Sequence, residues 1–362
     1  MGWLTCYGAG EPPEVGAGQP DLTIEVAEQL AEDDPDRQPV LAVEDLHAYF
    51  ATDEGVLRAV DGVSFALYSG ETLGIVGESG SGKSVTCRAV IRLLPRTAHS
   101  SGSIEYGGRN LLRLPSSEIQ SVRGDHIAMI FQDPMSSLNP VMRVGDQIAE
   151  ALSAHRRLSA GERKMQTLEL MRLVGIPAPK QRFRDYPHQF SGGMRQRVLI
   201  AIALACRPRI LLADEPTTAL DVTIQDQILT LLLKLREELG MSMILVSHDL
   251  AVIAETCDRV AVMYAGQIVE SAPTARLLAR PRHPYTVGLL RSLPRLDSGD
   301  RYLTPIAGAP PSLVDPPTGC RFYDRCPLRE DACRVWKTQL LEVEEGHTTR
   351  CRRHAQVELT DA

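Results

Sequence analysis

The sequence lacks any apolar segment long enough to cross a lipid bilayer. A spanning helix needs roughly 20 consecutive apolar residues, and the apolar run from Leu199 to Cys206 falls well short of that length. The first residues, Met1 to Cys6, also lack the basic and apolar stretches of a secretory signal. We therefore expect a chain that lies in the cytosol and does not cross a membrane by itself.

The sequence also lacks an excess of positively charged residues. The chain has 39 Lys and Arg against 46 Asp and Glu, which gives a formal net charge of −7. Binding to nucleic acid by counterion release needs clustered Lys and Arg, so we expect no nucleic acid as a main partner. The hydrophobic content of 43% over 362 residues is sufficient for two or three compact units.

The pattern of residues changes several times along the chain. Residues 1–38 are rich in Gly, Pro, Asp and Glu, which predicts a disordered leader. Short apolar runs alternate with helical segments over 39–140 and 205–266, which predicts an α/β core with a parallel sheet covered on both faces. Residues 141–204 have helical periodicity and no strand signal, and 267–362 form a Pro-rich, irregular C-terminal extension. The expected buried strands are Thr72 to Val76, Ile127 to Phe131, Ile210 to Ala213, Met243 to Val246 and Val260 to Tyr264.

A glycine-rich segment follows the first of these core strands and precedes a helix. It matches the pattern G-x-x-x-x-G-K-[ST], in which backbone N–H groups and a helix N-terminus bind phosphate oxygens. In this pattern Lys83 reaches the β- and γ-phosphates of ATP, and Ser84 ligates Mg²⁺. We prefer this interpretation to a turn without a ligand, because the strand and helix that the pattern requires are both present. The predicted nucleotide-binding residues are Gly77, Glu78, Ser79, Gly80, Ser81, Gly82, Lys83 and Ser84.

Two carboxylates end another apolar strand, where Asp214 and Glu215 follow Ile210 to Ala213. Doubly wound sheets bind ligands at the C-terminal ends of their strands. Asp214 is therefore a candidate Mg²⁺ partner, directly or through water, and Glu215 is the candidate base that polarises the attacking water. The alternative is a strand that ends in two solvated acids. The nearby phosphate loop favours the interpretation that the two carboxylates are catalytic.

A second anion site is indicated at Ser191. Its hydroxyl can cap a helix that begins at Gly192, which leaves the N–H groups of Gly192 and Gly193 directed outward. Such chemistry suits a γ-phosphate, although an isolated Ser-Gly-Gly helix start is more often structural.

These motifs resemble those of ATP-binding cassette (ABC) ATPases. The segment from Phe190 to Arg197 resembles the family signature Leu-Ser-Gly-Gly-Gln, with Phe190 and Met194 as substitutions. Gln132, Asp221 and His248 stand where the family has its Q-loop, D-loop and H-loop. The resemblance implies that Gln132 senses Mg²⁺ and the water, that Asp221 crosses a dimer interface, and that His248 contacts the γ-phosphate.

Phe50 resembles the aromatic residue that stacks on adenine in this family, and Tyr49 should then point to the opposite face of its strand. A core aromatic remains the alternative for Phe50. The family fold comprises a P-loop NTPase core of RecA-like type with a parallel sheet, an antiparallel β subdomain and a helical subdomain. Two copies of this fold close on ATP, so that the phosphate loop of one faces the Ser191 helix of the other.

The resemblance is closest to the dipeptide/oligopeptide importers and covers about residues 40–355. The segments that carry it are 70–84, Asp133 to Pro140 and His283 to Thr286. Glutathione and nickel importers share these segments, so the cargo stays open. The family implies a peripheral location on the cytoplasmic face of the membrane. Its partners are a second ATPase subunit, which is a related chain or a second copy, two integral membrane permeases and, indirectly, an extracytoplasmic binding protein.

Two other functions use a similar ATPase head. A DNA-maintenance ATPase needs a long coiled coil, for which the segment between Gln132 and Ser191 is too short. A soluble ATPase of iron–sulfur assembly does not need the segment from His283 to Thr286.

Half of the eight cysteines crowd into the tail with spacings of five, six and seventeen residues. These gaps are wider than those of most zinc knuckles, and disulfides are disfavoured in the cytosol. Four thiolates suit a [4Fe–4S] cluster or Zn²⁺, and importers with such a tail are thought to carry the cluster. The alternatives are a [4Fe–4S] cluster, a zinc ion or unligated thiols at Cys320, Cys326, Cys333 and Cys351.

Overall fold

Alternate residues of the central strands face two different hydrophobic cores. In β7 (Ile210–Asp214), Ile210 and Leu212 belong to one core, whereas Leu211 and Ala213 belong to the other. β8 (Ser242–Ser247) alternates in the same way. Because side chains of a strand point alternately to the two faces of its sheet, these strands form a sheet that is covered on both faces, as the sequence predicts.

The computed structural model describes residues 38–133, 137–218, 220–292 and 306–359. The expected leader therefore lies outside the described residues except for Gln38, as does Ala219, which stands two residues before Asp221 of the expected D-loop. Residues 38–362 belong to one compact unit.

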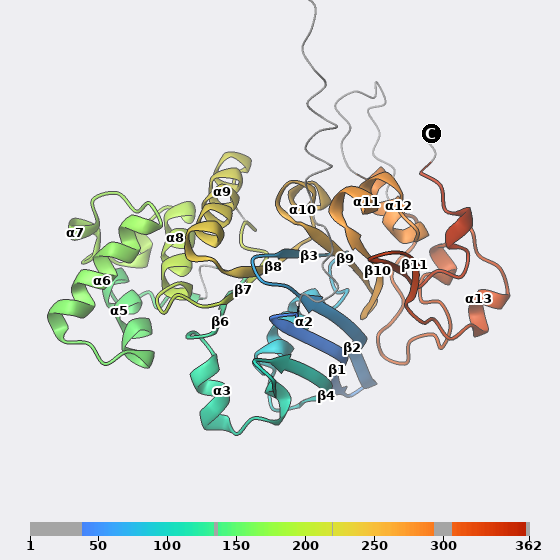
Figure 1. The fold of residues 1–362 in the computed structure, drawn as a ribbon, viewed down its shortest axis with the longest axis horizontal. Coiled ribbons are helices and arrows are strands. Elements are labelled where there is room, and N and C mark those ends of the chain that lie inside the picture. Colours follow the sequence, from blue (N-terminus) through green and yellow to red (C-terminus); the bar gives the residue numbers. More distant parts are fainter. Residues whose placement is uncertain (1–37, 134–136, 219, 293–305, 360–362) are drawn as a thin grey trace, which may run out of the picture. The chain divides into compact units, whose positions relative to one another are not determined.

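An eight-stranded sheet in the order β11-β12-β10-β9-β3-β8-β7-β6 crosses this unit (Figure 1). The strands from β9 to β6 in this order run parallel, and all the expected core strands are among them. The other three pair antiparallel at one edge. The remaining bounds are β3 (Thr72–Val76), β6 (Ile127–Ile130), β9 (Arg259–Tyr264), β10 (Gln267–Pro273), β11 (Leu341–Glu344) and β12 (His347–Thr349).

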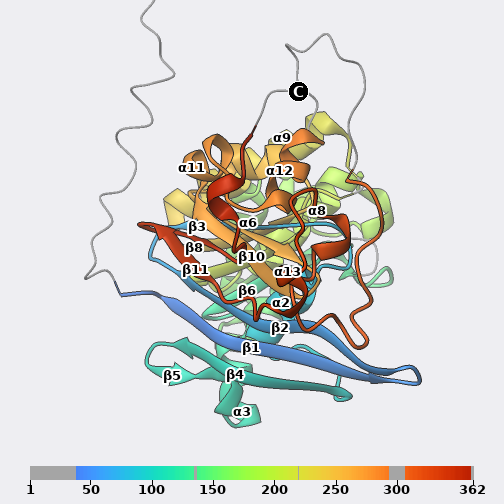
Figure 2. The same ribbon diagram turned by 90° about the vertical axis from the view of Figure 1, so that its right-hand side faces the viewer.

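A second, four-stranded sheet of order β2-β1-β4-β5 is antiparallel. One hydrophobic core joins it to helix α2 and to one face of the large sheet, and both views place α2 between the two sheets (Figure 1, Figure 2). This core fixes the start of α2 against the end of β3. The bounds are β1 (Leu41–Thr52), β2 (Gly55–Leu67), β4 (Ala98–Tyr106), β5 (Arg109–Asn110) and α2 (Lys83–Val90).

The other core lies on the opposite face of the large sheet and includes the helical segment. Among the described helices, none is long and apolar enough to span a bilayer. The helix bounds are α3 (Ser116–Val122), α5 (Val144–His155), α6 (Ala160–Leu173), α7 (Pro179–Arg182), α8 (Gly192–Ala203), α9 (Val222–Leu239), α10 (Leu250–Thr256), α11 (Thr274–Ala279), α12 (Pro284–Arg291) and α13 (Ala332–Val335).

The C-terminal extension has more regular structure than its Pro-rich sequence indicates. It supplies β10, β11 and β12 to the large sheet and the helices α11 to α13. His347 and Glu270 join β12 to β10 through a contact of 2.8 Å between Nε2 and Oε1, and both side chains are fully buried. The extension is therefore continuous with the core sheet, whereas its cysteine-containing part has mainly short turns.

Gly74 of β3 provides a test of this packing. A Cβ atom at Gly74 would lie 2.8 Å from Cγ2 of Ile253 and 3.0 Å from Sγ of Cys257, both on or next to α10. We expect Gly74→Ala to lower the free energy of unfolding by about 1–3 kcal/mol because of this overpacking.

Gly161→Ala is the matched control, because no atom lies within 4 Å of the added Cβ in the first turn of α6. We expect it to stabilise the chain by about 0.4–1 kcal/mol. Urea denaturation followed by circular dichroism measures both variants, and equal stabilities would contradict the proposed contact between β3 and α10.

Candidate functional site

The phosphate loop connects the end of β3 to the start of α2. Two of its glycines are required by close backbone contacts. A Cβ at Gly77 would lie 2.0 Å from the carbonyl oxygen of Met263, and one at Gly82 would lie 2.3 Å from that of Ala59. Gly82 also caps α2 with a φ of 106°, a left-handed conformation that favours glycine. The loop is thus held between β9 and β2.

Lys83 begins α2 and turns back over this loop. Its Nζ donates to the carbonyl oxygens of Gly77 at 2.7 Å and Glu78 at 2.9 Å. The side chain is buried, which lowers the pKa of its ammonium group, while the nearby carboxylates of Glu215 and Asp214 act in the opposite direction. Lys83 therefore places a positive charge inside the loop that would bind phosphates.

Ser84 and Asp214 meet where α2 begins beside the end of β7. The Ser84 hydroxyl donates to Oδ1 of Asp214 at 2.7 Å. Asp214 is fully buried, its Oδ2 has no hydrogen-bond partner, and burial raises the pKa of its carboxyl group. A buried carboxylate oxygen without a partner, next to a hydroxyl, fits the oxygen ligands that Mg²⁺ prefers.

Glu215 follows Asp214 and occupies an uncommon backbone conformation with a φ of 46°. Its N–H donates to the carbonyl oxygen of Val246 at 3.0 Å, which ties it to β8. Non-glycine residues with positive φ are often found at functional sites, where the surrounding structure holds them. The conformation directs the Glu215 side chain toward the segments that follow β6 and β8.

Three side chains converge on one carboxylate oxygen, Oε2 of Glu215. Gln132 donates from Nε2 at 2.9 Å, Thr218 donates from Oγ1 at 2.9 Å, and Nδ1 of His248 lies at 3.3 Å. Gln132 and His248 were predicted for this site from the sequence. The structure brings both to the predicted base, while the Ser84 and Asp214 pair forms a separate contact.

Sequence reasoning missed Thr218. Its hydroxyl is positioned because the turn after β7 folds back, with the N–H of Thr218 donating to the carbonyl oxygen of Glu215 at 3.2 Å. The only signal in the sequence is a threonine three residues after Glu215, a spacing that many turns share. The hydrogen bond fixes one rotamer of Glu215 together with Gln132.

The Ser191 helix has the predicted cap. Ser191 accepts a hydrogen bond from the N–H of Met194 at 3.3 Å, and α8 begins at Gly192. A Cβ at Gly193 would lie 2.6 Å from Cγ2 of Ile224, and one at Gly192 would lie 3.2 Å from Leu220. The contacts described for this helix start are with α8 itself and with the segment that enters α9.

Asp221 is the N-cap of α9, because its Oδ1 accepts from the N–H of Ile224 at 3.0 Å. It therefore fixes the start of the helix against which Gly193 packs. In the described part of the chain, the hydrogen bonds of Asp221 and Ser191 do not reach the phosphate loop. Both residues are exposed.

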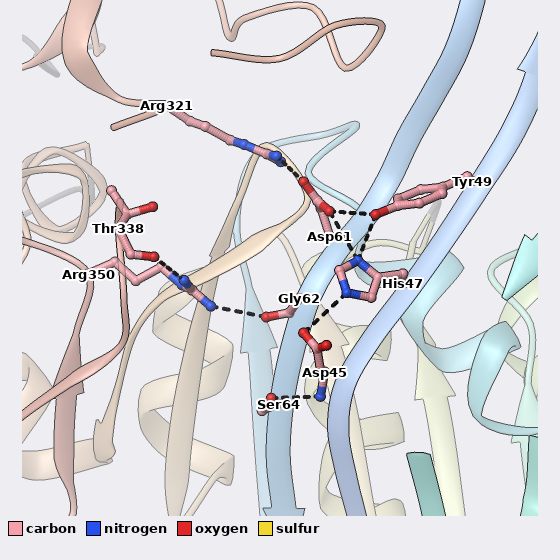
Figure 3. Close-up of polar contacts among 9 residues, drawn as sticks. All are labelled: Asp45, His47, Tyr49, Asp61, Gly62, Ser64, Arg321, Thr338 and Arg350. Carbon is pink, nitrogen blue, oxygen red and sulfur yellow. Dashed lines mark hydrogen bonds and ion pairs between the residues drawn. The ribbon is translucent and has the colours of Figure 1, made fainter. Parts of the chain in front are cut away.

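Phe50 and Tyr49 lie on β1 and have different surroundings. The Tyr49 hydroxyl donates to Oδ1 of Asp61 at 2.8 Å and lies 2.7 Å from Nδ1 of His47, and Arg321 of the extension pairs with the same Asp61 (Figure 3). Burial is the main cause that raises the pKa of Tyr49 to about 12. The Tyr49 side chain is thus held in a polar cluster, and Phe50 is half-buried on the same strand.

The four cysteines of the extension line one pocket. Burial is the main cause that raises the thiol pKa of Cys320 to about 11 and that of Cys351 to about 12, and nearby cysteines act in the same direction. Within the described residues, however, no group of three or more His, Cys, Asp or Glu side chains is arranged to hold a metal ion. The four sulfur atoms are suitable donors for a metal ion, but in the described residues they are not arranged as a ligand set.

Two family models match this chain, one before the C-terminal extension and one within it. The family model described as ABC transporter matches residues 60–218. The model described as oligopeptide/dipeptide transporter, C-terminal region, matches residues 269–333.

Relatives match over most of their length. The dipeptide transport ATP-binding protein of Bacillus subtilis is 51% identical over 87% of this chain and 94% of its own. The oligopeptide transport ATP-binding protein of Salmonella typhimurium is 49% identical over 81% and 88%. A solved dimeric ATP-binding cassette, bound to ADP and phosphate in a post-hydrolysis state, has a TM-score of 0.58 and 29% identity over 65% of this chain and 98% of its own. The chain therefore belongs to the ABC transporter family of ATP-binding proteins, in the group that carries the oligopeptide/dipeptide transporter C-terminal region.

Proposed function

We propose that this chain is the ATP-hydrolysing subunit that energises import of dipeptides or oligopeptides. The observation that carries the proposal is the convergence of Gln132, Thr218 and His248 on Glu215, beside the phosphate loop. The matched C-terminal region and the names of the relatives support peptides as the cargo. Glutathione and nickel remain the alternative cargoes within the same group.

The residues of one chain divide the chemistry between them. The loop amides and Lys83 bind the phosphates, and Mg²⁺, when bound through Ser84 and Asp214, neutralises phosphate charge. Glu215 accepts the proton of the attacking water. Its hydrogen bonds with Gln132 and Thr218 orient the carboxylate, and His248 extends toward the γ-phosphate. Phe50 stacks on the adenine ring.

Each complete site needs two ATPase subunits. The Ser191 helix start, with the N–H groups of Gly192 and Gly193, binds the γ-phosphate held by the partner's loop, and Asp221 lies at the interface. The partner is a second copy or a related chain.

We assign residues 39–140 and 205–266 to the ATPase core and 141–204 to the helical subdomain. Movement of this subdomain on closure switches two membrane permeases between inward and outward states. An extracytoplasmic binding protein delivers the cargo to these permeases.

We also propose that Cys320, Cys326, Cys333 and Cys351 hold a [4Fe–4S] cluster, with Zn²⁺ as the alternative. Their common pocket supports this proposal. Burial raises the thiol pKa of Cys320, Cys326 and Cys351, so these thiols would have to lose protons when a metal ion binds. Rearrangement of the pocket would have to bring the sulfur atoms into a ligand set. The metal would then crosslink the turn-rich end of the extension.

Glu215→Gln tests the assigned base. We expect the variant to keep its affinity for ATP and to lose at least about a hundredfold in turnover, because the amide cannot accept the proton. We also expect the closed dimer to accumulate with ATP, as measured by size-exclusion chromatography. Turnover near the wild-type rate would show that Glu215 is not the base.

Purification from membranes tests the transport role. We expect the chain to be recovered with integral membrane subunits and to support ATP-dependent uptake of labelled di- or oligopeptides into vesicles. The Glu215→Gln assembly is the matched control and should show no uptake. Recovery with soluble scaffold proteins alone would contradict transport, and uptake of glutathione or nickel without peptides would correct the cargo.

Metal analysis with visible absorption after anaerobic purification tests the cysteine pocket. We expect about four iron atoms per chain, and a loss of both iron and absorption in Cys326→Ser. Cys206→Ala is the control, because Cys206 is buried elsewhere, and it should retain the iron. Stoichiometric zinc without iron would exclude the cluster, and no bound metal would leave the thiols unligated.

A further inference from the structure

The segment from His283 to Thr286, which the site chemistry leaves without a role, reaches the phosphate loop. Tyr285 of α12 is fully buried, and its hydroxyl accepts a hydrogen bond from the N–H of Glu78 at 2.8 Å. His283 caps the helix by accepting from the N–H of Tyr285 at 3.1 Å. Burial lowers the pKa of His283 to about 3, so the imidazole is neutral and can act as this acceptor. The cap therefore fixes the helix turn that presents the Tyr285 hydroxyl to the loop.

The side chain of Glu78 is held by a second part of the extension. Arg325 donates from Nη1 to Oε2 of Glu78 at 2.7 Å and from Nη2 to Oε1 at 2.9 Å. This paired geometry is the strongest arrangement between an arginine and a carboxylate. The Arg325 side chain is 5% exposed and that of Glu78 is 27% exposed. The pair is thus largely shielded from solvent.

Arg325 is itself fixed in place. Its Nε donates to the carbonyl oxygen of Ala307 at 3.0 Å, and its Nη2 donates to that of Ile306 at 3.1 Å. The guanidinium carbon lies 5.7 Å from the ring centroid of Tyr264 and 5.9 Å from that of Phe322. The rings of Tyr264, Tyr285 and Phe322 also contact one another. An aromatic cluster therefore supports both groups that contact Glu78.

Glu78 matters to the nucleotide site through its carbonyl oxygen and its charge. Lys83 donates to that carbonyl oxygen at 2.9 Å, so the position of Glu78 helps to determine the position of the Lys83 ammonium group. The Glu78 carboxylate also acts electrostatically on the Lys83 ammonium. Without a counter-charge, a carboxylate in the phosphate loop would repel a triphosphate.

We propose that Arg325 is a positioning residue of the nucleotide site, which neutralises Glu78 and holds its carboxylate away from the bound phosphates. Tyr285 fixes the backbone of the same residue. The C-terminal extension is then part of the phosphate-binding apparatus of this chain. This inference rests on the proposed ATPase function of the loop.

The test compares ATP affinities of the full-length chain and its variants by titration with a fluorescent ATP analogue. We expect Arg325→Met to weaken binding about tenfold through the uncompensated charge of Glu78. The double variant Arg325→Met with Glu78→Gln should bind within about threefold of the wild type, because the repelling charge is gone. In the assembled transporter, Arg325→Met should raise the KM for ATP and leave kcat nearly unchanged.

Arg329→Met is the matched control, since Arg329 donates within the extension to the carbonyl oxygen of Asp324, and it should bind ATP like the wild type. Equal affinities of Arg325→Met and wild type would overturn the inference. So would a double variant as weak as Arg325→Met, because a merely structural role is not rescued by removal of the Glu78 charge. If the wild type bound no nucleotide, or if Lys83→Ala bound like the wild type, the proposed function would fail as well.

Discussion

The parallel register of three strands is the constraint on which the site depends. Val76 of β3 pairs with Ser247 of β8, and Asp214 of β7 pairs with Val246 of β8, so the three strands end at one level. The segments that follow these ends carry Lys83, Glu215 and His248. A shift of one residue in this register would invert the two buried faces and separate these groups. The extensive apolar packing on both faces of the sheet therefore also fixes the relative positions of these three residues.

The extension is tied to the core by arginines that stand next to cysteines. Arg321 follows Cys320 directly and pairs with Asp61 of β2. Arg325 precedes Cys326 and holds Glu78, and Arg350 precedes Cys351 and donates to the carbonyl oxygen of Gly62 at 3.0 Å (Figure 3). Because adjacent residues share a backbone segment, a link between the cysteines would restrain all three arginines. The cysteine pocket and the phosphate loop are thus parts of one connected structure.

The sequence predicts most of the ATPase core because its signals are local. A strand, a glycine-rich turn and a helix start predict the phosphate loop around Lys83, and an apolar run before Asp214 and Glu215 predicts the end of β7. The hydroxyl of Thr218 and the pairing of Arg325 with Glu78 leave no such signal. The second depends on contacts between residues 247 positions apart in the chain, which only the folded structure brings together. The Pro-rich extension also gave no periodic pattern for β11 and β12, since these strands are short and complete a sheet formed elsewhere.

The contacts of the Ser191 helix connect its start to the turn that follows β7. Gly193 packs against Ile224 in the first turn of α9, and Asp221 caps that same turn. α9 is reached from β7 through the segment that carries Glu215 and Thr218. A displacement of the Ser191 helix start would therefore press on the first turn of α9, and through it on the turn that carries Glu215 and Thr218. If the helix start faces a partner's γ-phosphate as we propose, this short connection would let the occupancy of the partner's site influence the orientation of Glu215.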